Sequence, residues 1–190
     1  MISIKTSTGN DRKGAPAKPL AIALLAIAAC AHAHAQPAAS FVAAERIGNL
    51  RIGSPESEVK GGVACPLKAG EAWRSATLKR EGERGLFGPS TYHEEWENVP
   101  CGLKVGMAGK AGRALAAESI AVFAPSTLAT SRGIRIGSTE AEVEKAYAAE
   151  WNRAVDERGK AFLAGTTERG LIFYFENGRV VRMLLRAPAN

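Results

Sequence analysis

The sequence predicts an α+β protein made of two tandem repeats, each a short helix layer packed on an antiparallel β-sheet. The first observation is a repeated phrase: "LRIGSPESEV" at 50–59 and "IRIGSTEAEV" at 134–143 are identical at seven of ten positions. The second is that β-forming runs follow both copies, and the third is a hairpin pattern at 169–186. Self-similarity at a fixed offset is typical of copies of one structural unit. The prediction of two similar halves therefore rests on this repeat.

Residues 1–35 have the pattern of a secretory signal peptide. Four basic residues precede an apolar run at 20–29, which is too short to span a bilayer and is followed by small residues. Cleavage before Gln36 gives a soluble chain, whereas the lipobox-like "IAAC" would leave a lipidated Cys30. No later segment is apolar enough to span a membrane. We therefore expect a periplasmic or secreted bacterial protein, with a lipid-anchored outer-membrane lipoprotein as the alternative.

The mature chain carries little net charge. Removing the leader takes away four basic residues and one acidic residue, so the formal net charge falls from +6 to +3. The remaining basic residues are dispersed along the chain, whereas a nucleic-acid-binding protein gathers them on one face or element. We expect no nucleic-acid partner.

Two cysteines, Cys65 and Cys101, follow the leader. An even pair in an oxidising compartment most simply forms a disulfide, which would stabilise the fold by roughly 3–4 kcal/mol through loop closure. Two unpaired buried thiols are the alternative. His93 is the only histidine of the mature chain, so a metal site is a poor interpretation of the cysteines. We expect neither a metal nor another cofactor.

Each copy of the repeated phrase predicts the start of a helix. Ser54 and Ser138 are N-cap candidates, and Pro55 occupies the favoured first helical position. Glutamates follow in the first turn of each helix, where they suit the helix dipole. In the second copy an apolar stripe at helical spacing is expected to face the core; its members are Val143, Ala146, Tyr147 and Trp151.

Strands are predicted from runs of β-forming residues after each helix. The offset between equivalent positions drops from 84 at the helices to 63 at the last strand, so the first half holds about 21 extra residues between helix and sheet. The segments expected as strands are 73–78, 90–98, 101–107, 118–125 and both arms of the final hairpin. The expected organisation is a signal peptide at 1–35, a linker at 36–47, a first repeat at 48–127 and a second repeat at 128–190.

The final hairpin is expected to separate a core face from an outer face. A two-residue turn at Asn177-Gly178 would pair Phe175 with Val180 and Tyr174 with Val181. On this register the core face carries Ile172, Tyr174, Val181, Met183 and Leu185. We interpret the opposite face as a partner-binding surface, because aromatic and arginine side chains dominate interface hot spots; its residues are Phe173, Phe175, Arg182 and Arg186, joined by Trp96 and Tyr92 from the other half. A face covered by the protein's own loop or helix is the alternative.

Catalytic motifs are weak throughout the chain, and we expect no catalytic residue. Ser57 and Lys60 have S-x-x-K spacing, but Gly61 ends that helix at once and the companion motifs of penicillin-recognising enzymes are missing. The glycines at 106–112 have neither phosphate-loop nor dinucleotide spacing and are interpreted as a mobile turn. His93 and Asp156 have no spacing that recommends a Ser-His-Asp arrangement.

The chain resembles the tandem-repeat superfamily of bacterial β-lactamase-inhibitor-protein-like and small outer-membrane lipoprotein domains. The resemblance rests on the paired RIGS-x-E-x-E-V phrases, on "EEW", "GLKV" and "SIAVFAPS", and on the closing "GLIFYFENGRV", and it covers 48–186. It implies a helix layer on an antiparallel sheet, twice over, in an exported protein that binds another protein. It assigns no binding residue, because the inhibitory loop and acidic contact residues of the β-lactamase inhibitors have no counterpart here.

These observations together predict an exported, non-enzymatic protein-binding domain, an inhibitor or modulator of an envelope or extracellular enzyme. The first alternative is an outer-membrane-associated lipoprotein with a structural or assembly role in the cell envelope. The second is an enzyme whose site has no recognisable motif.

Overall fold

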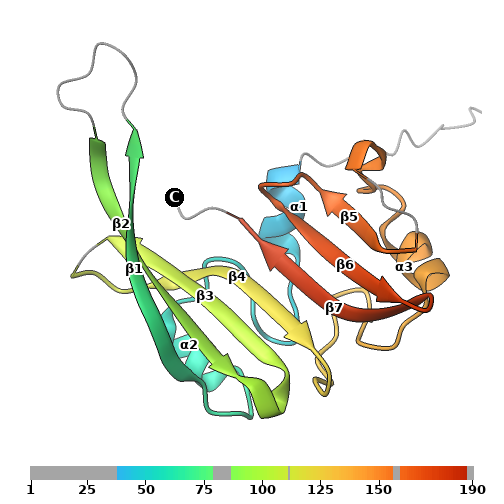
Figure 1. Ribbon diagram of the computed structural model, residues 1–190, viewed down its shortest axis with the longest axis horizontal. Coiled ribbons are helices and arrows are strands. Elements are labelled where there is room, and N and C mark those ends of the chain that lie inside the picture. Colours follow the sequence, from blue (N-terminus) through green and yellow to red (C-terminus); the bar gives the residue numbers. More distant parts are fainter. Residues whose placement is uncertain (1–37, 79–86, 111, 156–158, 188–190) are drawn as a thin grey trace, which may run out of the picture. The chain divides into compact units, whose positions relative to one another are not determined.

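The strands form a seven-stranded antiparallel sheet in the order β1-β2-β3-β4-β7-β6-β5 (Figure 1). The computed structural model describes residues 38–78, 87–110, 112–155 and 159–187. The helices are α1 (Ala38–Ala44), α2 (Glu56–Gly61) and α3 (Glu140–Tyr147), with 3₁₀ turns η1 (Val99–Cys101) and η2 (Arg153–Val155). The strands are β1 (Lys68–Leu78), β2 (Phe87–Asn98), β3 (Leu103–Lys110), β4 (Ala116–Phe123), β5 (Ala161–Gly165), β6 (Gly170–Glu176) and β7 (Arg179–Arg186).

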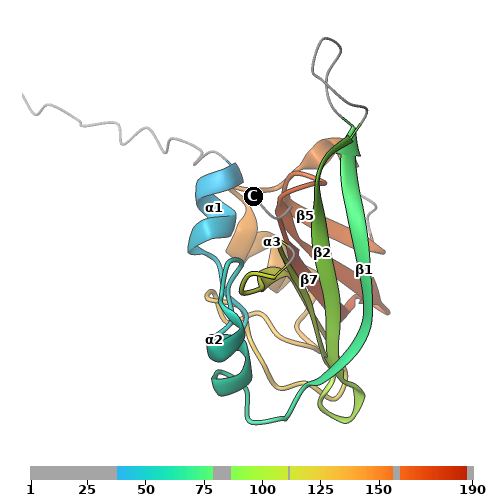
Figure 2. The same ribbon diagram turned by 90° about the vertical axis from the view of Figure 1, so that its left-hand side faces the viewer.

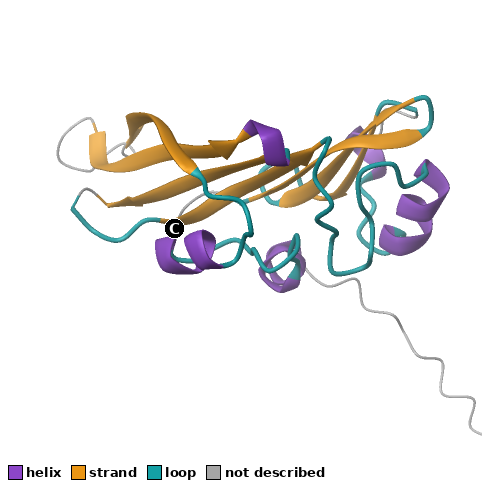
Figure 3. Cartoon of the chain, turned by 90° about the horizontal axis from the view of Figure 1, so that it is seen from below, coloured by secondary structure: helices purple, strands orange, loops and turns teal. Residues whose placement is uncertain are grey.

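The three α-helices of the described residues lie on the same face of this sheet, and the hydrophobic core fills the space between the two layers (Figure 2, Figure 3). Alternate side chains of each strand point toward the helices, among them the fully buried Ile120 of β4 and Met183 of β7. The predicted α+β class is confirmed. The strands of the two halves do not form separate sheets, because β4 pairs with β7 and joins them.

The segment expected as a linker begins the folded layer. Phe41 and Val42 of α1 are buried, as is Ile47 just after the helix. The Phe41 ring meets the Tyr147 ring of α3 edge-on, with centroids 6.0 Å apart. Phe41, Val42 and Ile47 therefore belong to the core rather than to a linker.

Helix α3 starts one residue later than predicted. Thr139, not Ser138, is its N-cap: the Thr139 hydroxyl accepts the backbone N–H of Glu142 (3.3 Å), and the Glu142 carboxylate accepts the Thr139 N–H (2.7 Å). These bonds hold the pKa of Glu142 below its ordinary value. The Ser138 hydroxyl instead accepts the N–H of Arg135 (3.2 Å) and closes the preceding turn.

In the first copy of the repeated phrase, Ser54 is likewise not the N-cap of the helix that follows. Pro55 occupies the N-cap position of α2, which has no side-chain cap. The Ser54 hydroxyl accepts the N–H of Arg51 (3.4 Å) and donates to the Glu58 carboxylate (3.1 Å). Both serines of the repeat thus hold the turn before a helix rather than cap the helix itself.

The hairpin of β6 and β7 turns at Asn177 and Gly178, as predicted. Both residues have positive φ, 52° and 71°, which suits a tight two-residue hairpin turn. Phe175 pairs with Val180 as expected. A bulge then shifts the register, so that Tyr174 lies opposite Arg182 instead of Val181.

The bulge decides which side chains reach the core. It leaves Phe173 and Phe175 on the helix side of β6 and brings Met183 and Leu185 of β7 to the same side. Ile172 and Tyr174, expected in the core, lie on the opposite side of β6 and are only partly buried. The predicted assignment of faces is therefore wrong for β6, because one extra residue in β7 lets both strands bury their larger apolar side chains.

The sulfur atoms of Cys65 and Cys101 lie at disulfide distance, 2.08 Å. The pair joins the segment between α2 and β1 to η1, which follows β2. The side-chain amide of Asn98 reinforces this junction by donating to the Pro66 carbonyl (2.7 Å). The edge strand β1 is thereby fastened at its start.

The predicted leader, with Cys30 and the cleavage position, lies outside the described residues, as does Asp156. None of the helices in the described ranges is long and apolar enough to cross a bilayer.

Candidate functional site on the open face of the sheet

The face of the sheet opposite α1, α2 and α3 is called the open face, because no α-helix of the described chain covers it (Figure 3). Paired residues place one apolar row across its C-terminal half: Leu163, Ile172, Leu184 and Ala121, from β5, β6, β7 and β4. A neighbouring row pairs Tyr174 and Phe123 with Arg182 between them. The six apolar and aromatic residues are called the C-terminal patch.

Two arginines from β7 flank the apolar row of the C-terminal patch, Arg182 on one side and Arg186 on the other. The Arg182 guanidinium lies 5.4 Å from the centroid of the Tyr174 ring, where a cation–π attraction holds it. Arg186 donates to the backbone carbonyl of Thr167. Within the patch Leu163 and Ala121 are buried by their neighbours, whereas the other members are partly exposed. The surface offered to a partner is thus apolar in the middle and cationic at its margin.

Of the six residues predicted to bind a partner, the structure places only Arg182 and Arg186 on the open face. Phe173 and Phe175 are 0% and 5% exposed and belong to the core. Trp96 is 3% exposed and lies on the helix side, with the ammonium of Lys60 on α2 5.0 Å from its ring centroid. These three residues cannot form an outer surface, and the prediction is corrected for them.

Tyr92 also lies on the helix side of β2, because it alternates in step with Trp96. Its hydroxyl donates to the Glu94 carboxylate (2.8 Å), which also accepts the indole N–H of Trp96 (2.7 Å). The bond to Glu94 raises the pKa of Tyr92. The side chain is partly buried and does not join the C-terminal patch.

A second cluster on the open face links three strands through His93. The Nδ1 atom of His93 on β2 lies 2.7 Å from a Glu118 carboxylate oxygen on β4, and its Nε2 atom lies 2.7 Å from the Ser75 hydroxyl on β1. The Trp73 ring stacks on the imidazole, with centroids 5.2 Å apart and planes 6° apart. Both ring nitrogens and one ring face of His93 are therefore engaged.

Strand β3 lies between His93 and Glu118 and leaves space for their contact. His93 is opposite Ala108 of β3, which has a small and buried side chain. A bulge in β4 leaves Glu118 unpaired while Gly106 faces Ser119. A Cβ atom on Gly106 would come within 2.4 Å of the Ser119 hydroxyl, so any larger residue would force the Ser119 side chain to shift. Gly106 thus belongs to a strand and not to the mobile turn predicted for 106–112.

Lys104 pairs with two carboxylates of the neighbouring strand on the open face. The Lys104 ammonium on β3 lies 2.7 Å from the Glu95 carboxylate and 3.5 Å from that of Glu97, both on β2. The hydrogen bond to Glu95 raises the pKa of Lys104. Such partly exposed ion pairs contribute little to stability.

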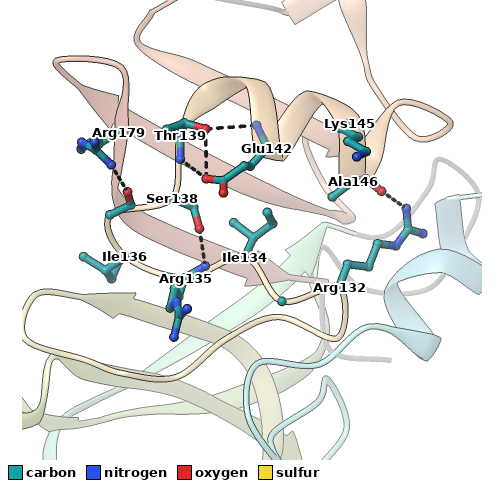
Figure 4. A pocket seen from close by; sticks show the side chains of 12 residues that line it. Arg132, Ile134, Arg135, Ile136, Ser138, Thr139, Glu142, Lys145, Ala146 and Arg179 are labelled. Carbon is teal, nitrogen blue, oxygen red and sulfur yellow. Dashed lines mark hydrogen bonds between the residues drawn. The ribbon is translucent and has the colours of Figure 1, made fainter.

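A pocket of about 740 Å³ lies between α3 and the loop before it (Figure 4). Four of its lining residues are basic: Arg132, Arg135, Lys145 and Arg179. Arg132 is already bound to the Glu150 carboxylate by two bonds of 2.7 and 2.8 Å, and Arg179 donates to the Gly137 carbonyl (2.9 Å). Two of the four cations therefore hold the loop in place, which favours a structural role for this pocket.

A buried carboxylate ties α1 to the same loop. Glu45 accepts the backbone N–H groups of Arg46 (2.9 Å) and Ser131 (3.0 Å) and the Tyr147 hydroxyl (3.0 Å). Burial raises the pKa of the Tyr147 hydroxyl, and the Arg132 guanidinium lies 4.6 Å from the Tyr147 ring centroid. This cluster lies beneath the surface and organises the fold.

Comparisons of the chain with protein-family models, with curated proteins and with solved structures found no match.

Proposed function

We propose that this chain binds another protein through the open face of its sheet, as an inhibitor or modulator of an envelope or extracellular enzyme. The C-terminal patch is the observation that supports this function best. Its partly exposed members come from the three neighbouring strands β4, β7 and β6 and form an apolar surface beside the buried Leu163 of β5. Contiguous apolar surface rimmed by polar groups is typical of an interaction site.

The chemistry of the patch indicates what a partner would present. Aromatic and aliphatic side chains of the partner would bury against Ile172, Tyr174 and Leu184. Carboxylates at the margin of that segment would bind Arg182, whose five donors suit a carboxylate. Arginine and aromatic residues contribute most strongly to binding when such a surface is desolvated.

The finer architecture is part of the same proposal: we infer that the two halves are copies of one unit. In the first half the Ala117 N–H donates to the Ser54 carbonyl (2.9 Å), and in the second the Val180 N–H donates to the Ser138 carbonyl (2.8 Å). The two serines are 84 positions apart and the two strand residues are 63 apart, the same offsets that the sequence repeat has. This agreement supports the repeat interpretation, because equivalent residues of two copies should make equivalent hydrogen bonds.

The pairing of the two halves supports the same interpretation. Ala121 of β4 pairs with Leu184 of β7, and these positions are also 63 apart. If the two halves are copies of one unit, β4 and β7 are equivalent strands. Equivalent strands pair with each other when two copies meet across a twofold axis, as in a symmetric dimer interface. The C-terminal patch extends over both strands of that junction, so the proposed binding surface would exist only where the copies are joined.

The compartment proposed is the bacterial periplasm or the extracellular space. The chain starts with basic residues, followed by an apolar run and then by small residues, and this order supports export. A disulfide between Cys65 and Cys101 suits an oxidising compartment. A lipidated Cys30 would place the same binding surface at a membrane and favour an assembly role in the envelope. The lipobox-like "IAAC" is the feature that supports this second candidate.

Capture from a periplasmic extract tests the binding function. Immobilised wild-type protein is expected to retain a partner that Leu184→Glu retains at least about tenfold less, because a charge in the middle of an apolar interface must be desolvated. Lys145→Glu is the matched control, since it introduces the same side chain on the exposed surface of α3. Both variants need the thermal stability of the wild type.

Equal capture by the wild type and by a folded Leu184→Glu variant would exclude the C-terminal patch as the binding surface. Loss of capture by Lys145→Glu alone would move the function to the helix side.

A further inference from the structure

We propose that Ser75 is an activated nucleophile, and that Ser75, His93 and Glu118 form a site that accepts acyl groups from activated esters. The proposal goes beyond protein binding and uses none of the residues of the C-terminal patch. The two hydrogen bonds at His93, both 2.7 Å, connect a hydroxyl, an imidazole and a carboxylate in the order of a nucleophile, a general base and an orienting acid.

The hydrogen-bond roles follow from the carboxylate. An ionised Glu118 can only accept, so the Nδ1 atom of His93 carries the proton that it donates. The Nε2 atom of the neutral ring then has a free lone pair, and the Ser75 hydroxyl donates to it. This tautomer is the one in which a histidine can remove the proton of a serine hydroxyl.

The position of the imidazole is fixed from two directions. Glu118 holds Nδ1, and the Trp73 ring stacks on the face of the imidazole. The same stacking would stabilise an imidazolium through the electron-rich ring face. The side chains of His93 and Glu118 are only 12% and 19% exposed, whereas Ser75 is exposed. The base is therefore sheltered from water while the nucleophile remains accessible.

The strand register supplies groups for the substrate. Ser75 is paired with Thr91 and Thr91 with Lys110, so these three residues occupy one row on the open face. The Thr91 hydroxyl and the Lys110 ammonium are donors that can face a developing oxyanion. Trp73, which is 44% exposed, offers an apolar wall for an aromatic leaving group. Side-chain donors organise an oxyanion less well than paired backbone N–H groups, which favours activated esters over amides.

The reaction proposed is acyl transfer to Ser75. The Ser75 oxygen attacks the carbonyl carbon of the ester while its proton passes to Nε2 of His93. The bond from the carbonyl carbon to the leaving oxygen then breaks, and the leaving alcohol or phenol takes the proton from Nε2. Water repeats both steps on the acyl-serine, which releases the acid and restores the hydroxyl.

A fluorophosphonate probe on the disulfide-intact mature protein tests this site. The expected result is one covalent adduct, located by mass spectrometry on the peptide that contains Ser75, and no adduct in Ser75→Ala. Labelling of His93→Gln and of Glu118→Gln is expected to be at least about tenfold slower, since each removes part of the base. Ser131→Ala is the control, because Ser131 is an exposed serine elsewhere on the surface and should leave labelling unchanged.

A wild-type protein without an adduct at Ser75 would overturn the proposal. So would labelling at the wild-type rate in either folded variant, His93→Gln or Glu118→Gln, because the three residues would then form only a structural hydrogen-bond chain. The two variants serve as alternatives if one of them fails to fold. Variants that lose probe labelling are expected to capture the partner as the wild type does. A negative labelling result therefore does not bear on the C-terminal patch, and a negative capture result does not bear on Ser75.

Discussion

Replacing Phe173 by alanine is expected to lower the free energy of unfolding by about 3–5 kcal/mol, whereas Tyr174→Ala is expected to cost about 1 kcal/mol or less. Phe173 is fully buried on the helix side of β6, with its ring centroid 5.1 Å from that of Tyr147 and 6.2 Å from that of Phe162. Removing the ring leaves a cavity that these neighbours cannot fill. Tyr174 points to the open face and is partly exposed, so its loss removes little buried area.

Urea denaturation of both variants, followed by circular dichroism, measures this difference. The two residues are adjacent on the same strand, so each serves as the control for the other. A greater loss from Tyr174→Ala than from Phe173→Ala would restore the unbulged hairpin register that the sequence predicts and would contradict the assignment of faces.

Loss of the disulfide is expected to lower the free energy of unfolding by roughly 3–4 kcal/mol. The bond would close a loop with a sequence separation of 36 residues, and a cross-link of that span removes much conformational freedom from the unfolded chain. It also fastens the start of β1, an edge strand that pairs only with β2. The loss should therefore affect β1 before the rest of the sheet.

A Cys65→Ser/Cys101→Ser double variant, compared with the oxidised wild type by urea denaturation, measures this contribution. Thiol titration of the denatured, unreduced wild type should find no free cysteine in the mature chain. Two free thiols, or equal denaturation midpoints for the two proteins, would contradict the disulfide.

Features that depend on neighbouring residues could be predicted from the sequence. The Asn177-Gly178 turn and the pairing of Phe175 with Val180 are local, and both are as predicted. The apolar stripe of α3 is also correct, since Val143 and Tyr147 are fully buried and Ala146 and Trp151 pack against the core. The helix starts are wrong by one residue, because Ser138 and Thr139 are both good N-cap residues and only the capping box with Glu142 distinguishes them.

Features that depend on distant residues could not be predicted in this way. A bulge in β7 changes which face of β6 the following β7 residues share, and no single residue in the sequence predicts it. The junction of β4 with β7 joins segments from opposite halves of the chain. The contacts of His93 are a further case: Ser75 and Glu118 are 18 and 25 positions away, and the link to Glu118 passes over β3. The alternation of β2 was the only sequence signal that could have placed His93 beside the open face.

Site-specific photo-crosslinking in the producing cell tests whether the open face binds another protein. A photoreactive phenylalanine analogue at position 184 lies in the middle of the C-terminal patch, and one at position 145 lies on the exposed surface of α3. If the open face binds another protein, position 184 should give a discrete crosslinked species and position 145 should give none. A crosslink from position 145 alone, or no crosslink from position 184 in a folded and exported variant, would contradict it.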